Sequence, residues 1–287
     1  MKVSDIETVG VIGSGTMGAQ IAMLCALSGY QVVLNDIEEV NLLKAKESLQ
    51  GHMKRRIQKG KLTEEDVNFA FSRLSFSSNI QDVKDADIVI EAVVEKLEIK
   101  RELFARLEDI TKEGTILATN SSTIVSSKIA SATKNPENVC NLHFFNPPLV
   151  MELVEVVRGP HTSDDTAEAA YEFIKTLNKV PVLLKKEISG FIANRILGKL
   201  LDEAVFLLEN DYATHDEIDL VVKKALRHPL GPFELMDLTG IDVTYFVRSQ
   251  RYQESNNEED KPSDILKEKV EKGELGRKTG KGFYQYS

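Results

Sequence analysis

Short apolar runs alternate with longer amphipathic stretches from the N-terminus to about residue 187. The runs that suit buried strands lie at 9–12, 31–36, 86–95 and 115–120, with two more inside 140–157. Helical spacing of apolar residues separates some of them, as in Ala19–Leu27 and Lys100–Ile110. Strands that alternate with helices predict an α/β fold with a doubly wound, mostly parallel sheet of the Rossmann type.

The pattern changes near residue 187. From Gly190 onward apolar positions recur at helical spacing, first in a stripe over 190–210 and again after Thr214, and no strand is predicted. A polar loop covers 256–264. We therefore predict two domains, one over 1–186 that contains the sheet and an all-helical C-terminal domain over 187–287.

A basic amphipathic segment interrupts the first domain. Between Lys44 and Lys61 the chain carries seven lysines and arginines and one acid, Glu47. The apolar spacing predicts a helical hairpin insertion over about 40–72. Two interpretations stay open, a solvated charged face or a surface that holds a phosphorylated substrate.

A glycine-rich turn joins the first strand to the first helix. Gly13, Gly15 and Gly18 form the G-x-G-x-x-G pattern, with Thr16 and Met17 inside it. Such glycines allow a tight turn, a close backbone approach to a pyrophosphate, and close packing of helix on strand. The helix N-terminus adds free N–H groups for the phosphates. The pattern predicts a dinucleotide site made by these five residues; the alternative is a glycine turn in an α/β protein without a nucleotide.

An acidic residue ends the second strand. Asp36 follows the glycines at about the spacing expected for the acid that binds a ribose 2′-hydroxyl. Glu38 and Glu39 come next, with no arginine nearby. Three acids would repel a 2′-phosphate, so the sequence predicts NAD rather than NADP.

Polar groups follow several of the predicted strands. They are Glu95, the run Asn120-Ser121-Ser122-Thr123, and His143. Serine or threonine after a strand is most often a turn or a helix N-cap. In a doubly wound sheet, however, ligands bind at the carboxyl ends of the strands. These groups therefore define a candidate ligand site.

A carboxylate lies inside the last apolar strand of this region. Alternation in "MELVEVV" places Glu155 on one face with Leu153 and Val157, which predicts that it is buried. A buried carboxylate needs a partner, and His143 is the nearest candidate across the turn at Pro147-Pro148. Such a pair orients an imidazole as a general base; it can equally be a structural bridge.

Composition narrows the classes of protein. The net charge is −9, which argues against nucleic-acid binding. No run reaches the length that a membrane helix needs. Cys25 and Cys140 are the only cysteines and predict no disulfide framework. Without a signal-like N-terminus the expected location is the cytoplasm, with a processed organellar precursor as the alternative. No metal site is predicted.

Taken in order, these motifs resemble the 3-hydroxyacyl-CoA dehydrogenase family. The likeness runs from about residue 5 to the end and rests on "GVIGSGTMGAQIA", "DIVIEAVVEKLEIK", "ATNSST", "HFFNPP", "MELVEVV", "GFIANR" and "GRKTGKGFYQY". The length resembles that of compact bacterial 3-hydroxybutyryl-CoA dehydrogenases. The resemblance implies NAD as cofactor, an acyl-CoA substrate, a role of the fatty-acid β-oxidation type, and a homodimer formed by the helical domain.

The resemblance also implies roles for single residues. His143 is the implied base with Glu155 as its partner, and the substrate-side residues are Ser122, Asn146 and Asn194. Contacts to NAD fall to Asp36, Glu95, Lys100, Lys278, Ser122 and Asn146. Contacts to coenzyme A fall to His52, Lys59 and Ser122, although the family usually has a small polar residue where His52 stands.

The activity implied is reversible NAD-dependent oxidation of an (S)-3-hydroxyacyl-CoA, with a short acyl chain such as 3-hydroxybutyryl, to the 3-ketoacyl-CoA. Three alternatives remain at this point. One is a related dehydrogenase of a free hydroxy acid of the gulonate type. Another is an NAD-binding protein without catalysis. A third is a dehydrogenase with a lysine base, although no lysine stands at a comparable strand end.

Overall fold

The computed structural model describes residues 3–286, without the side chains of residues 254, 255 and 259. Its internal contacts divide the chain into two compact units, one ending at Ile192 and the other beginning at Ala193. Each unit is described by itself below.

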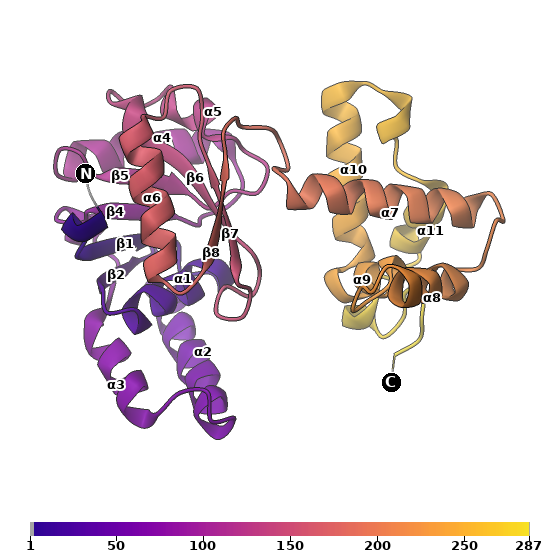
Figure 1. Cartoon of the computed structure of the whole chain (residues 1–287), viewed down its shortest axis with the longest axis horizontal. Helices are drawn as coiled ribbons and strands as arrows, with labels where there is room; N and C mark the ends of the chain where they lie inside the picture. The colour runs from indigo at the N-terminus through magenta and orange to yellow at the C-terminus, as the bar shows by residue number, and fades with distance from the viewer. Residues whose placement is uncertain (1–2, 287) are drawn as a thin grey trace. The chain divides into compact units, whose positions relative to one another are not determined.

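The first unit is built on an eight-stranded sheet (Figure 1). Its strands lie side by side in the order β3-β2-β1-β4-β5-β6-β7-β8. All neighbours are parallel except β6 and β7, which are antiparallel. The bounds are β1 Thr8–Ile12, β2 Gln31–Asn35, β3 Leu74–Ser77, β4 Ile88–Glu91, β5 Ile116–Thr119, β6 Val139–Phe144, β7 Leu153–Val157 and β8 Val180–Leu184. The predicted doubly wound, mostly parallel sheet is confirmed.

Helices cover both faces of this sheet. Successive strand residues belong to two different apolar clusters, as Ile88 and Ile90 do on one side and Val89 on the other. The first cluster includes α1 (Thr16–Leu27) and α6 (Asp164–Thr176), and the second includes α4 (Leu97–Ile110) and α5 (Ser126–Ala130). Burial on both faces explains why the strands are nearly continuous apolar runs.

The strand predicted over 86–95 is too long. β4 ends at Glu91, level with Ile12 in β1 and Thr119 in β5. Both neighbouring strands end at these positions, so the following residues have no partner with which to continue the sheet. Glu95 therefore lies in the loop before α4 and not at a strand end.

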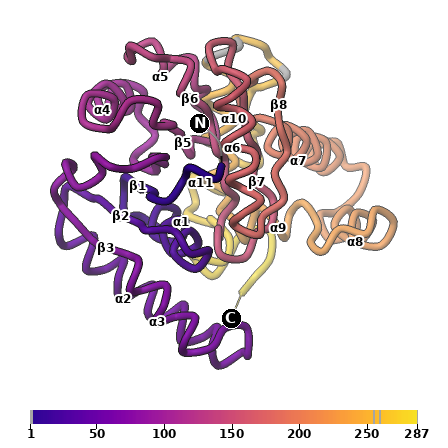
Figure 2. The backbone as a smooth tube through the Cα atoms, turned by 60° about the vertical axis from the view of Figure 1, so that its left-hand side comes forward, coloured from indigo at the N-terminus to yellow at the C-terminus, as the bar shows by residue number. Residues whose placement is uncertain are grey.

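Two helices form a hairpin between β2 and β3. They are α2 (Glu39–Gln58) and α3 (Glu64–Arg73), and both views show them side by side beyond the sheet (Figures 1 and 2). A capping box begins α3, where Thr63 and Asp66 each bind the other's backbone N–H. The buried side of α2 carries Leu42, Ala45, Leu49 and Met53, which leaves most of its basic residues at the surface.

The second unit is helical, as predicted. Its helices are α7 (Ala193–Glu209), α8 (His215–Ala225), α9 (Pro232–Thr239), α10 (Ile241–Ser255) and α11 (Asp264–Glu271). Within the described residues, no named strand follows β8. None of the helices described in residues 3–286 is long and apolar enough to cross a membrane.

Two buried aspartates hold the C-terminal segment against this unit. Asp219 accepts hydrogen bonds from the backbone N–H of Phe233 and from the Tyr284 hydroxyl. Asp237 accepts from the N–H of Phe283 and Tyr284 and from the Tyr286 hydroxyl. Each carboxylate is 1% exposed. Buried carboxylates with several donors make the tail an integral part of the helical unit.

Candidate active site

The glycine-rich turn has the geometry that a dinucleotide needs. Gly13 has φ of +97°, a conformation that side chains rarely adopt, and a Cβ on Gly18 would lie 1.8 Å from the Gly13 carbonyl oxygen. A Cβ on Gly15, in contrast, would meet nothing within 4 Å. The first and third glycines therefore serve the turn itself, and the second keeps the outer side of the turn open.

The N-terminus of the helix that follows the turn has a positive partial charge, and its first turn carries no acid that would neutralise it. α1 starts at Thr16 rather than at Ala19, with Gly15 as its N-cap. Among the described residues, no side chain caps this end and no acid lies in its first turn. Such an N-terminus attracts phosphate oxygens. The turn and the helix together fit a dinucleotide pyrophosphate.

Asp36 lies beside the turn, directly after β2. The backbone N–H and the hydroxyl of Ser14 both donate to its Oδ2 at 2.8 Å. Burial alone would raise the pKa of Asp36, but hydrogen bonds from Ser14, Glu38 and Asn41 outweigh it and hold the pKa below its ordinary value. Asp36 is therefore an ionised acceptor at the mouth of the turn.

A cavity of about 340 Å³ opens between the turn and α2. Its wall includes Gly15, Thr16, Lys44 and His52. The pKa of His52 lies below its ordinary value because of partial burial and the positive charges of Arg55 and Arg56. His52 is therefore neutral near pH 7, so the positive charge on this side comes from the lysines and arginines around it.

The predicted pair of His143 and Glu155 is present. The two residues are directly opposite in the antiparallel register of β6 and β7, so their side chains leave the same face of the sheet. His143 Nδ1 lies 2.8 Å from Glu155 Oε2, and the two side chains are 7% and 1% exposed. Because a carboxylate only accepts, Nδ1–H is the donor, which leaves Nε2 as the acceptor nitrogen.

The segment after β8 completes the surroundings of this pair. The backbone N–H of Ile192 donates to Glu155 Oε1 at 2.9 Å. The His143 ring packs on Phe145 and on the fully buried Phe191, with ring centroids 4.5 and 5.4 Å away. Positive φ at Gly190 and Phe191 sets up this turn. The sequence reasoning missed these contacts; the glycine before Phe191 was the only local signal.

The other polar strand-end residues lie nearby in the same unit. Ser122 is half-buried in the turn after β5. The neighbouring Asn120 accepts from the N–H of Phe144 through Oδ1 at 3.0 Å, which ties this turn to the residue after His143. Asn146 is exposed in the turn after β6. The sheet therefore brings Ser122, His143 and Asn146 to its carboxyl edge.

Side chains from α1 and α2 hold the loop that follows Asn146. Gln20 accepts from the N–H of Leu149 at 3.4 Å, and Arg56 donates to the Leu149 carbonyl at 3.0 Å. Arg56 belongs to the basic run, which is predicted to be either a solvated face or a surface for a phosphorylated substrate. At least this arginine also has a structural contact.

Glu95 and Lys100 form part of a buried network. Lys100 is 1% exposed, with Nζ 3.2 Å from Glu95 Oε2 and 2.6 Å from Glu91 Oε1. Burial would raise the pKa of Glu95, but bonds from Ser121 and Thr123 and the charge of Lys100 lower it below its ordinary value. Glu91 was not predicted, although a carboxylate inside an apolar run is the same signal that identified Glu155.

The remaining predicted residues lie at the end of α2 or in the helical unit. Lys59 is exposed at the C-terminal end of α2. Asn194 is half-buried in the first turn of α7, in the helical unit. Lys278 lies in the same unit, where Nζ is 2.6 and 2.7 Å from the two carboxylate oxygens of Asp242.

A doubly wound sheet with this glycine turn, an acid after β2 and a His–Glu pair at its carboxyl edge defines a nicotinamide-dependent dehydrogenase. Comparison with known families makes the assignment specific. The model "3-hydroxyacyl-CoA dehydrogenase, NAD binding domain" matches residues 8–188, and "3-hydroxyacyl-CoA dehydrogenase, C-terminal domain" matches residues 190–286. The chain belongs to the 3-hydroxyacyl-CoA dehydrogenase family, and it is an NAD-dependent enzyme of that family.

Individual relatives match this chain over nearly its whole length. A 3-hydroxybutyryl-CoA dehydrogenase of Bradyrhizobium diazoefficiens is 39% identical over 281 residues, covering 98% of this chain and 96% of the relative. The mitochondrial hydroxyacyl-coenzyme A dehydrogenase of Mus musculus is 42% identical over 289 residues, covering 98% and 91%. The crystal structure of (S)-3-hydroxybutyryl-CoA dehydrogenase from Ralstonia eutropha matches with a TM-score of 0.93 at 39% identity, covering 99% and 100%.

Proposed function

We propose that the chain catalyses the reversible oxidation of short-chain (S)-3-hydroxyacyl-CoA, such as 3-hydroxybutyryl-CoA, to the 3-ketoacyl-CoA, with His143 as general base. The observation that carries this proposal is the 2.8 Å contact between His143 and Glu155 at the carboxyl edge of the sheet. The names of relatives with about the same length support the short-chain substrate. NAD, when bound, accepts the hydride that leaves C3 of the substrate.

His143 and Glu155 have different roles in the proton transfer. His143 Nε2 takes the proton of the substrate hydroxyl as the alcohol is oxidised. The imidazolium that forms stays bonded to Glu155 through Nδ1–H. Glu155 is buried and bonded to Nδ1, so its carboxylate stabilises that positive charge. Phe145 and Phe191 pack against the ring and limit its rotation.

We assign the remaining residues around this reaction. Ser122 and Asn146 hold the substrate and the nicotinamide near His143, and Asn194 supports the acyl carbonyl. The turn from Gly13 to Gly18, with Thr16 and Met17, binds the pyrophosphate, and Asp36 binds the adenosine ribose. Glu95 and Lys278 contact NAD. The resemblance implies a contact from Lys100 as well, but Lys100 is 1% exposed, so we infer that it contributes by holding Glu95.

The basic hairpin is the proposed site for coenzyme A. Lys59 supplies positive charge for its phosphates, and His52 lines the cavity between the hairpin and the glycine turn. Coulomb attraction to a polyanionic ligand is reduced by salt. The KM for acyl-CoA is therefore expected to rise with ionic strength.

We also propose an oligomeric state and a location for the enzyme. The enzyme works as a homodimer formed by the helical unit, which exposes large apolar side chains such as Ile196, Phe206, Leu220 and Phe246. Its location is the cytoplasm.

Substrate comparison tests the proposed activity. Oxidation of NADH is followed with acetoacetyl-CoA, with free acetoacetate, and with 3-ketoacyl-CoA substrates of increasing chain length. We expect turnover with the CoA thioesters, highest kcat/KM for the shortest chains, and none with the free acid. Equal turnover of free acetoacetate, or tight NADH binding without turnover of any thioester, would refute the proposal. A kcat/KM that rises with chain length would refute the short-chain preference.

A further inference from the structure

A carboxylate–lysine pair is buried at the carboxyl end of β4. Glu91 is 0% exposed and Lys100 on α4 is 1% exposed, with 2.6 Å between Nζ and Oε1. Replacing a buried ion pair by apolar side chains of similar size is often neutral or stabilising. Stability alone therefore does not explain why charges occupy this position.

Glu91 joins the ends of two neighbouring strands. Its Oε1 also accepts from the N–H of Val93 at 2.7 Å, at the start of the loop after β4. Its Oε2 accepts from the Thr119 hydroxyl at 2.7 Å, and Thr119 is its register partner at the end of β5. One buried carboxylate thus fixes the points from which both strand-end loops depart.

The contacts continue from Lys100 to the turn that carries Ser122. Lys100 Nζ lies 3.2 Å from Glu95 Oε2. Glu95 Oε1 accepts from the hydroxyls of Ser121 and Thr123, the latter at 2.8 Å. Ser121 and Thr123 are the residues on either side of Ser122, so Glu95 holds the turn at both ends.

We propose that Glu91 is a positioning residue that acts through Lys100 and Glu95 to fix the Ser121–Thr123 turn and so places Ser122 against the substrate. The inference rests on the proposed function, in which Ser122 contacts the reactants. Without the Glu91 charge, Lys100 has Glu95 as its remaining partner in this network. The lysine then draws Glu95 toward itself and away from the two hydroxyls. A small misplacement of a group at a reacting centre costs rate much more than it costs binding.

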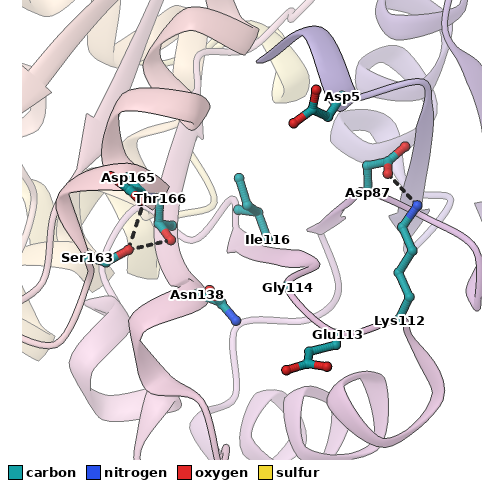
Figure 3. Close-up of a pocket in the computed structure, with 10 residues that line it drawn as sticks. All are labelled: Asp5, Asp87, Lys112, Glu113, Gly114, Ile116, Asn138, Ser163, Asp165 and Thr166. Carbon is teal, nitrogen blue, oxygen red and sulfur yellow. Dashed lines mark hydrogen bonds and ion pairs between the residues drawn. The ribbon is translucent and has the colours of Figure 1, made fainter. Parts of the chain in front are cut away.

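The matched control is a second buried acid, which directly precedes the same strand. Asp87 precedes β4 at its amino end, forms an ion pair with Lys112, and accepts from the N–H of Glu7 and Thr8. Figure 3 shows this pair on the wall of a pocket at that edge. Asp87→Asn therefore removes a comparable buried charge at the amino edge of the sheet, whereas Ser122 lies at the carboxyl edge.

Kinetics of Glu91→Gln and Asp87→Asn test the inference with acetoacetyl-CoA and NADH. We expect both variants to melt at lower temperature, but only Glu91→Gln to lose kcat, by about tenfold or more. An unchanged kcat in Glu91→Gln, or an equal loss in Asp87→Asn, would overturn the positioning role. A wild-type enzyme that turns over no acyl-CoA would refute the proposed function and the positioning role with it. An active wild type with an equally active Glu91→Gln would refute the positioning role alone.

A double-mutant cycle with Ser122→Ala distinguishes an effect on the position of Ser122 from a general effect on the fold of the enzyme. If Glu91 acts through Ser122, adding Glu91→Gln to Ser122→Ala changes kcat by no more than about twofold. Losses that multiply would contradict the inference.

Should Glu91→Gln not fold, Thr123→Val removes the outer contact with Glu95 alone. We expect it to lower kcat by about threefold or more, again only when Ser122 is present, and an unchanged kcat would overturn the inference.

Discussion

At the residue scale, Glu155 explains why a buried strand carries a charge. Its two oxygens accept from His143 Nδ1–H and from the N–H of Ile192. The register of β6 and β7 and the turn after β8 therefore both orient the carboxylate. The His143 ring is fixed in turn by its bond to Glu155 and by two phenylalanine rings. A base held in one orientation needs no rearrangement when it takes a proton.

We predict that Glu155→Gln lowers kcat on the order of 10²-fold or more, because an amide neither stabilises the imidazolium nor fixes the same tautomer. The pH–rate profile of the variant should shift, since the positive form of His143 loses its counterion. The measurement is kcat for acetoacetyl-CoA reduction across pH 5–9. A profile identical to that of the wild type would make Glu155 merely structural.

The cysteines provide a second test at this scale. Burial raises the pKa of the Cys140 thiol to about 12, and it raises the pKa of Cys25 as well. At pH 8 the Cys140 thiol therefore stays protonated, and both side chains are buried. We predict no alkylation of the native enzyme by iodoacetamide at pH 8 and full alkylation in denaturant. Rapid native labelling with loss of activity would contradict this.

At the scale of elements, the hairpin of α2 and α3 combines two tasks. Its inner side packs Leu49 and Met53 into the first apolar cluster, and Arg56 holds the Leu149 carbonyl. Lys44 lines the cavity that begins at the glycine turn, and Lys54 and Lys59 are exposed. The element therefore both supports the loop after Asn146 and offers positive charge to a ligand.

We predict that Lys59→Ala raises the KM for acetoacetyl-CoA several-fold and leaves the KM for NADH unchanged, because it removes charge from one ligand site alone. The increase should shrink at high salt. Lys84→Ala is the control, since Lys84 is exposed just before β4 on the amino side of the sheet. Equal effects of the two substitutions would remove Lys59 from the coenzyme A site.

The same scale shows what could be predicted from the sequence. Six of the eight strands, the glycine turn and the partner of Glu155 follow from local patterns: apolar runs, glycine spacing and alternation. The strands β3 and β8 were not predicted. The end of β4 did not follow from local patterns, because it depends on where β1 and β5 stop. Glu91 was missed for that reason, and the contacts of Ile192 and Phe191 were missed because they join segments far apart in the chain.

At the scale of the whole molecule, the chain has two compact units with separate cores. The helical unit leaves a stripe of apolar side chains exposed on α10, where Val243, Phe246 and Val247 are 48%, 59% and 52% exposed. Their spacing puts them on one side of the helix. An exposed stripe of this kind is typical of a surface that a partner covers.

We predict that the protein elutes with twice the chain mass of 32.1 kDa, and that Phe246→Glu shifts it toward the monomer because it places a charge in an apolar interface. Light scattering after size-exclusion chromatography measures both. Phe69→Glu, at an exposed position on α3 of the first unit, is the control. A wild-type monomer would contradict dimerisation through the helical unit.

A comparison of two histidine variants tests whether His143 is the base of this 3-hydroxyacyl-CoA dehydrogenase. kcat with acetoacetyl-CoA and the Kd for NADH are measured for His143→Gln and for His161→Gln, a half-buried histidine near the other end of β6 that bonds to the Val139 carbonyl. We predict that His143→Gln loses on the order of 10²–10⁴-fold in kcat while its NADH Kd stays within about twofold, and that His161→Gln retains its kcat. A His143→Gln enzyme that kept most of its kcat would show that His143 is not the base.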